Sequence, residues 1–159
     1  MQTRRKMMTQ SAAVPAVLST LPLAAGLYPG WAVAQTAAYN TAAFEAKSMG
    51  DVMKALGSAN PVESKDIAVT GPDIAENGAV VPIGASTALA GVKRMLVLIE
   101  KNPSLLAAMF EVTDAVDANF STRVKMGQSS NILAVAMMND GRAFYAQKEV
   151  KVTLGGCGG

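Results

Sequence analysis

Short apolar segments separated by turn signals run along most of this 159-residue chain and constrain its fold more than any other feature. Residues 120–126 and 150–154 alternate apolar with polar side chains, which is the pattern of a strand with one buried face. The other segments of this kind are residues 67–70, 80–83, 94–100, 105–112 and 132–138. About seven strands at short, even spacing predict an all-β sandwich or barrel.

Two local signals predict how the chain behaves between the first strands. Asn77-Gly78 is a strong two-residue hairpin signal when apolar residues flank it. Pro82 has no N–H to donate to a sheet ladder, so it is expected on an edge strand or at a strand irregularity.

One helix is expected before the strands. Asn40 or Thr41 caps its start near Ala42, and Gly57 ends it. Four apolar residues recur at helical spacing and predict one packed face: Met49, Val52, Met53 and Leu56. The two methionines are interpreted as part of this face and not as copper ligands.

The first 34 residues resemble a twin-arginine export signal. Arg4 and Arg5 form the arginine pair, and Ala32 and Ala34 flank the expected cleavage pattern before Gln35. Prolines interrupt the apolar stretch, so a membrane span is not expected there. We therefore expect export to the bacterial periplasm by the twin-arginine route, with no membrane anchor after the signal is removed.

The remaining body is nearly neutral, because 11 Lys and Arg face 12 Asp and Glu once residues 1–34 are set aside. This balance gives no basic face for nucleic acid. The chain is expected to divide into an export signal (1–34), a lead-in with the helix (35–65), a β-sandwich (66–154) and a mobile arm (155–159). A body of this size buries a core without needing a disulfide.

The only cysteine, Cys157, stands within a run of glycines that forms the expected arm: Gly155, Gly156, Gly158 and Gly159. Glycine gives the backbone its widest conformational range, and three extended residues reach roughly 10 Å. A lone cysteine in an exported protein indicates either pairing between chains or a free reactive thiol.

The residues of the body offer little material for catalysis. The chain has no His, and its one Cys cannot make a zinc ligand set, so no metal is expected. Asp114 and Asp117 are interpreted as loop residues, and Arg123 and Lys125 as an ordinary exposed strand face. An unperturbed thiol has a pKa near 8.5 and is only about three per cent thiolate at pH 7. Such a thiol is better suited to carry a covalently attached substrate group than to act as a nucleophile by itself.

The run Gly155-Gly156-Cys157-Gly158-Gly159 resembles the swinging arm of SoxY, the sulfur carrier of the bacterial thiosulfate-oxidising Sox system. Several body segments are similar to that family as well: Pro72-Asp73-Ile74-Ala75-Glu76-Asn77-Gly78, Val81-Pro82, Lys101-Asn102-Pro103, Thr122-Arg123 and Asp140-Gly141.

The resemblance implies an immunoglobulin-like β-sandwich and a heterodimer with a SoxZ-type subunit. It implies three enzymes that act on Cys157: a c-type cytochrome that joins thiosulfate to it, a di-manganese hydrolase that releases sulfate, and in some hosts a sulfane dehydrogenase. Cys157 is then the covalent attachment site of a non-catalytic carrier without a cofactor of its own. Two other classes remain open: a periplasmic thiol redox protein, and a structural protein that dimerises through Cys157.

Overall fold

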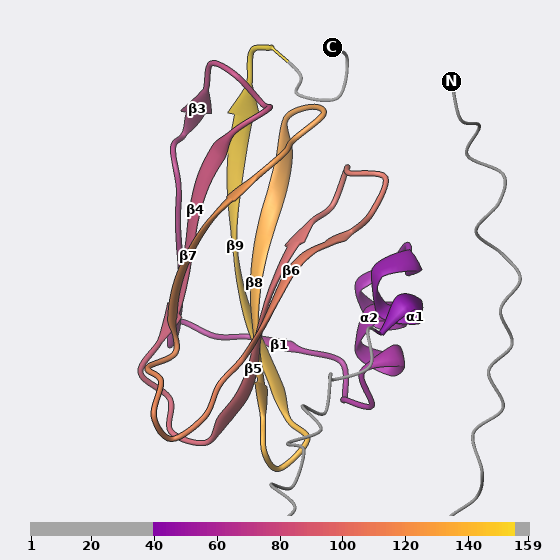
Figure 1. The fold of residues 1–159 in the computed structure, drawn as a ribbon, viewed down its shortest axis with the longest axis vertical. Helices are drawn as coiled ribbons and strands as arrows, with labels where there is room; N and C mark the ends of the chain where they lie inside the picture. Colours follow the sequence, from indigo (N-terminus) through magenta and orange to yellow (C-terminus); the bar gives the residue numbers. More distant parts are fainter. Residues whose placement is uncertain (1–39, 155–159) are drawn as a thin grey trace, which may run out of the picture. The chain divides into compact units, whose positions relative to one another are not determined.

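Two β-sheets face each other in the computed structural model, which describes residues 40–154 (Figure 1). The larger sheet has six strands, ordered β1-β9-β8-β5-β6, and β3 also pairs with β9. The smaller sheet has the order β2-β4-β7. The strands are β1 (Val62–Glu63), β2 (Ile67–Thr70), β3 (Ile74–Ala75), β4 (Val81–Thr87), β5 (Val92–Ile99), β6 (Leu106–Glu111), β7 (Asn119–Val124), β8 (Ser130–Met138) and β9 (Ala143–Val152).

The predicted β-sandwich is confirmed, and each of the seven predicted strand segments overlaps a long strand of the structure. The two strands that the sequence pattern missed, β1 and β3, have two residues each and are too short to show periodicity. Both pair in parallel with β9, one near each of its ends. β9 is therefore held on both sides, by antiparallel β8 and by these two short strands.

The core between the two sheets comes from alternate residues of the facing strands. β5 contributes Met95, Val97 and Ile99, and β8 contributes Ile132 and Ala134 among others. The residues between them are buried as well, because they pack against the helices on the other face of the larger sheet. Burial on both faces explains why β5 is continuously apolar from Met95 onward and β8 from Ile132 onward, whereas β7 keeps the half-buried alternation that its sequence predicts.

Two short helices replace the single helix that the sequence predicts, namely α1 (Thr41–Glu45) and α2 (Met49–Ala55). The backbone of Ala46 is extended, which ends α1. Ser48 then starts a second helix, since its Oγ accepts a hydrogen bond from the Asp51 N–H at 3.1 Å. The predicted cap at Asn40 is confirmed, because its Oδ1 accepts from the Ala43 N–H at 3.1 Å.

The predicted stop at Gly57 is confirmed too, with a φ of +70° that favours glycine. Both helices lie on the outer face of the larger sheet (Figure 1), where Val52 and Met53 are fully buried. Within residues 40–154, no helix is long and apolar enough to cross a bilayer.

Asn77-Gly78 does not form the predicted hairpin. β3 precedes this pair but bonds to β9 and not to β4. The hairpin turn that favours Asn-Gly needs a positive φ at both residues, and in the described chain only Gly57, Gly91 and Gly141 have one. Asn77 instead accepts a hydrogen bond from the Ala79 N–H through its Oδ1 at 2.8 Å, which makes a local side-chain turn.

Pro82 lies in β4, the central strand of the smaller sheet and not an edge strand. The pairing of β4 with β2 extends only from Gly84 to Thr87, however, while the pairing with β7 continues past Pro82. At Pro82 the strand therefore has a neighbour on one side only. The missing N–H is tolerated because this stretch of a central strand is locally an edge.

Candidate functional site

The predicted thiol follows shortly after Leu154, the last residue that the structure describes. The predicted site residues outside the described range are Gly155, Gly156, Cys157, Gly158, Gly159, Arg4, Arg5, Ala32 and Ala34. The part of the site that can be described is residues 151–154, the end of β9 and the two residues after it. We call these four residues the arm base.

The segment 73–78 runs beside the arm base and holds it by backbone hydrogen bonds. Lys151 donates its N–H to the Asp73 carbonyl, and Thr153 donates to the Ala75 carbonyl, each at 3.0 Å. The Thr153 hydroxyl adds a bond to the Glu76 carbonyl at 2.8 Å. The parallel strand β3 thus continues its pairing beyond the last residue of β9.

Gly78 connects the arm base to the smaller sheet. Its N–H donates to the Leu154 carbonyl at 2.7 Å, and its own carbonyl accepts from the Met126 N–H at 2.7 Å. Gly78 is buried, and Met126, just after β7, is fully buried in the sandwich core. The backbone of Leu154 is therefore fixed to both sheets although its side chain is exposed.

Ser129 holds the other side of the arm base. The regular pairing of β8 with β9 ends at the partners Ser130 and Val150. Beyond that point, Val152 donates its N–H to the Ser129 Oγ at 2.8 Å. A side-chain hydroxyl thus takes the place of the next backbone partner, and β9 stays bonded on both sides up to its last residue.

An ion pair lies beside this segment. The Lys148 Nζ contacts Asp73 Oδ1 at 2.6 Å. The hydrogen bond from Lys148, together with its positive charge, lowers the pKa of Asp73 below its usual value. Because the Asp73 side chain is 88% exposed, the pair contributes little to stability and mainly orients the start of the segment.

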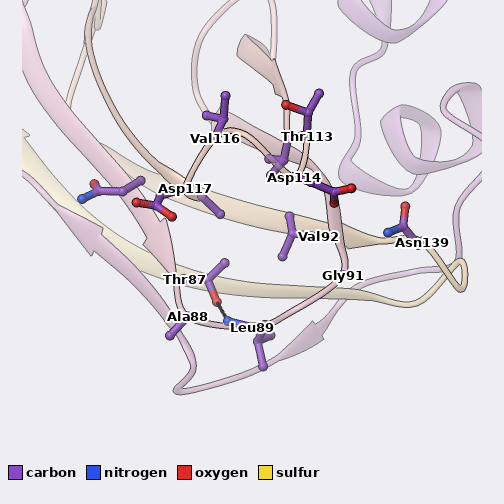
Figure 2. A pocket seen from close by; sticks show the side chains of 13 residues that line it. Thr87, Ala88, Leu89, Gly91, Val92, Thr113, Asp114, Val116, Asp117 and Asn139 are labelled. Atoms are coloured by element: carbon purple, nitrogen blue, oxygen red, sulfur yellow. Dashed lines mark hydrogen bonds between the residues drawn. The ribbon is translucent and has the colours of Figure 1, made fainter.

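The carboxylates considered from the sequence, Asp114 and Asp117, lie at the other end of the sandwich. Both line a pocket of about 620 Å³ that also includes Asn139, from the turn before β9 (Figure 2). Figure 2 shows the loop beside them, where the Thr87 Oγ1 accepts from the Leu89 N–H at 3.2 Å. Both carboxylates are exposed, as predicted from the sequence.

β9 runs from beside this pocket into the arm base, and its ten residues span about 30 Å at the usual rise of a strand. Cys157 is three residues beyond Leu154, so it reaches at most about 11 Å. The carboxylates Asp114 and Asp117 cannot act on the thiol of their own chain.

Arg123 and Lys125 lie on an exposed face at the end of β7, as expected. They line a groove of about 410 Å³ together with Ser104 and Thr122. Within residues 40–154 neither cation forms an ion pair. This groove is a second exposed feature at the end of the molecule that carries the arm base.

The helical methionines belong to the packed face, as predicted. Met53 is fully buried, and Met49 packs against the same cluster on the outer face of the larger sheet. In the described part of the chain, no group of three or more Asp, Glu, His or Cys side chains is placed to hold a metal ion.

Sequence reasoning missed the role of segment 73–78 in holding the arm base. It also missed Ser129, whose hydroxyl extends the pairing of β9. One sequence signal pointed to this segment, namely the resemblance of residues 72–78 to a family segment. Its role was not predicted from that signal, because Asn77-Gly78 indicated a hairpin instead.

Comparison with known families decides the relationship. The family described as sulfur oxidation protein SoxY matches residues 52–157, which is most of the chain and includes Cys157. The chain belongs to the SoxY family. A comparison with curated proteins gave no match.

Solved structures agree with this family assignment. The sulfur carrier protein SoxY from Chlorobium limicola f thiosulfatophilum is 32% identical, with a TM-score of 0.59. The match covers 65% of this chain and 94% of that one. A variant of the superoxide reductase (neelaredoxin) from Ignicoccus hospitalis has a TM-score of 0.50 at 15% identity, covering 57% of this chain and 82% of that one. At that identity the second likeness shows a shared fold alone.

Proposed function

We propose that this chain is a covalent sulfur carrier of periplasmic thiosulfate oxidation and that Cys157 bears the sulfur. The observation that carries the proposal is the SoxY family match, which extends to Cys157. The anchored arm base supports it. Residues up to Leu154 are bonded into the sandwich, with Gly78 linking Leu154 to Met126 just after β7, and three residues later the chain has its only thiol.

The chemistry of loading is an oxidation that joins two sulfur atoms. The Cys157 thiolate and the outer sulfur of thiosulfate form an S–S bond, and two electrons leave to a c-type cytochrome enzyme. The carrier then bears a thiosulfonate group and has lost its thiol proton. Thiolate formation takes place in the enzyme's active site, because an ordinary thiol is only a few per cent ionised at neutral pH.

Unloading starts by hydrolysis. A di-manganese hydrolase adds water across the bond between sulfur and the sulfonate group, so sulfate leaves and one sulfur remains on Cys157 as a persulfide. In hosts that have it, a sulfane dehydrogenase oxidises that remaining sulfur. The carrier has no turnover of its own and no resident cofactor in this scheme.

The proposal includes a permanent partner and an export route. A SoxZ-type subunit pairs with this chain, and the twin-arginine signal at Arg4 and Arg5 exports the two together. Membership of the SoxY family supports a partner from the Sox system. Size-exclusion chromatography with light scattering tests the pairing, and replacing both arginines with lysine tests the route.

The test of the carrier role is intact-protein mass spectrometry after incubation with thiosulfate, the cytochrome enzyme and an electron acceptor. Wild-type protein should gain the mass of one sulfur plus a sulfonate group, and the Cys157→Ser variant should gain none. Circular dichroism of both proteins should be the same, since Cys157 is not among the residues that form the helices and strands of the described sandwich. An adduct on the serine variant, or a wild-type protein that only forms disulfide-linked dimers, would contradict the proposal.

A further inference from the structure

Asn77-Gly78 does not form the hairpin that it predicts, yet it brings two mutually reactive groups together. The backbone nitrogen of the residue after an asparagine can attack the side-chain amide carbon. Glycine in that place reacts fastest, because it has no Cβ to crowd the nitrogen. Asn77 is the only asparagine in the sequence that glycine follows, since the others precede Thr41, Pro61, Pro103, Phe120, Ile132 and Asp140. By sequence, Asn77 is therefore the asparagine most open to this attack.

The structure holds both reacting groups in hydrogen bonds. The Gly78 N–H, whose nitrogen would attack, donates to the Leu154 carbonyl at 2.7 Å, and Gly78 is buried. The Oδ1 atom of Asn77 accepts from the Ala79 N–H at 2.8 Å, and Asn77 is exposed to solvent. The asparagine is thus accessible to water, whereas the nitrogen that must attack it is occupied as long as Gly78 stays bonded to the arm base.

We propose that Asn77 is a deamidation site and that the hydrogen bond from Gly78 to Leu154 gates its reaction. When this bond opens, hydroxide removes the Gly78 amide proton, and the nitrogen attacks the Asn77 amide carbon to close a succinimide ring. The side-chain nitrogen takes a proton from water and leaves as ammonia, which restores the hydroxide. Water then opens the ring at either carbonyl and gives aspartate or isoaspartate. No electrons are transferred, and the inference is independent of the carrier role.

The isoaspartate product changes how the arm base is held. It adds one carbon to the main chain directly before Gly78. Gly78 bonds to the Leu154 carbonyl on one side and to the Met126 N–H on the other, each at 2.7 Å, so the longer main chain disturbs this linkage. The aspartate product keeps the normal main chain and both bonds. Deamidation therefore loosens the end of the sandwich through one of its two products, and the change is irreversible.

The gate is tested by incubating the protein at mildly alkaline pH, folded in buffer and unfolded in guanidinium chloride. Peptide mapping by mass spectrometry follows the change from amide to acid at each asparagine, and chromatography separates isoaspartate from aspartate. We expect Asn77 to react fastest in the unfolded chain and roughly tenfold or more slowly in the folded protein. The control Asn77→Gln should react far more slowly in both states, because glutamine must close a larger ring.

Hydrogen exchange separates the gate from other effects on the asparagine. Exchange of the Gly78 amide and attack by its nitrogen need the same opening of the bond to Leu154 and the same loss of the amide proton. Thr153→Val removes a hydroxyl hydrogen bond of the arm base and should speed both reactions by the same factor, up to roughly fivefold. The matched control Thr122→Val, on β7, should change neither. Urea unfolding shows that both variants are folded under the conditions used.

Several results would overturn the inference. Equal deamidation rates in the folded and the unfolded protein would show that the bond to Leu154 is no gate. A faster reaction in the folded protein would mean that the Ala79 N–H activates the Asn77 amide instead. If Thr153→Val changed Gly78 exchange without changing deamidation, the reaction would proceed without the opening. An Asn77 that stays intact even in the unfolded chain would rule out the site itself. None of these measurements depends on loading of the thiol.

Discussion

Gly78 donates its backbone N–H to the carbonyl oxygen of Leu154 at 2.7 Å, and this bond joins the end of β9 to a segment far earlier in the chain. The carbonyl of the same glycine accepts from Met126, next to the smaller sheet. The last residue before the predicted glycine arm is therefore part of the sandwich. An arm that starts from such a point has a fixed origin, and its reach is set by its own length.

The Thr153 hydroxyl should stabilise the arm base locally. In the Thr153→Val variant the bond to the Glu76 carbonyl is lost, at a cost of under about 1 kcal/mol because the bond is exposed. We expect faster hydrogen exchange at the amides of Thr153 and Gly78, with the urea midpoint nearly unchanged. Thr122→Val is the matched control, a strand threonine on β7. Unchanged exchange at both amides would show that segment 73–78 holds the arm base without this hydroxyl.

The ion pair of Lys148 with Asp73 should make stability weakly dependent on pH. The pair lowers the folded-state pKa of Asp73 below its usual 3.8, so the folded state binds this proton less tightly than the unfolded state. The stabilisation is present above the unfolded pKa and is lost as the pH falls through the lower folded pKa. The Asp73→Asn variant should therefore be slightly less stable at neutral pH, and its urea midpoint should converge with that of the wild type in acid.

Asp114→Asn is the control for the loss of an exposed carboxylate, since Asp114 is exposed and forms no ion pair within residues 40–154. Its urea midpoint at neutral pH should follow that of the wild type. A difference between wild type and Asp73→Asn that grew toward acid would have the opposite sign and would contradict the assignment of the pair.

The layer between the helices and the larger sheet should contribute strongly to stability. Met53 is fully buried there, so Met53→Ala should lower the free energy of unfolding by about 2–5 kcal/mol. Met49→Ala removes the same atoms from a half-buried position of the same helix and should cost clearly less. Urea unfolding measures both. Equal losses would mean that α2 does not pack on the sheet as described.

Bulky side chains next to Cys157 should slow every enzyme that acts on this thiol. Gly156→Val and Gly158→Val widen the chain beside the thiol and restrict its backbone, so loading and sulfate release should both slow down. The Gly→Ala variants at the same positions should slow them less. Mass adducts on Cys157 and released sulfate are the measurements. Wild-type rates in the valine variants would argue against entry of the arm into a narrow active site.

Much of the sandwich could be predicted because alternation of apolar and polar residues is a local property. In β7 the exposed Arg123 alternates with the half-buried Thr122 and the buried Val124, as the sequence indicated. The cap at Asn40 and the stop at Gly57 were also readable, since each depends on a few neighbouring residues. The break between the two helices could not be predicted, because a serine such as Ser48 can lie within a helix or start one. In the structure its hydroxyl oxygen accepts a hydrogen bond from the Asp51 N–H, and this bond makes Ser48 the start of α2.

The sequence by itself determined the all-β class, the positions of the long strands and the lone thiol within a glycine run. These follow from residue type and spacing, which need no knowledge of the fold. Only the tertiary structure decided that β3 pairs with β9, that Gly78 bonds to Leu154 and that the side chains of Ile74, Val80 and Leu154 remain exposed. The physical reason is that strand partners and exposure depend on residues far apart in the chain, which come together only when the two sheets close on a common core.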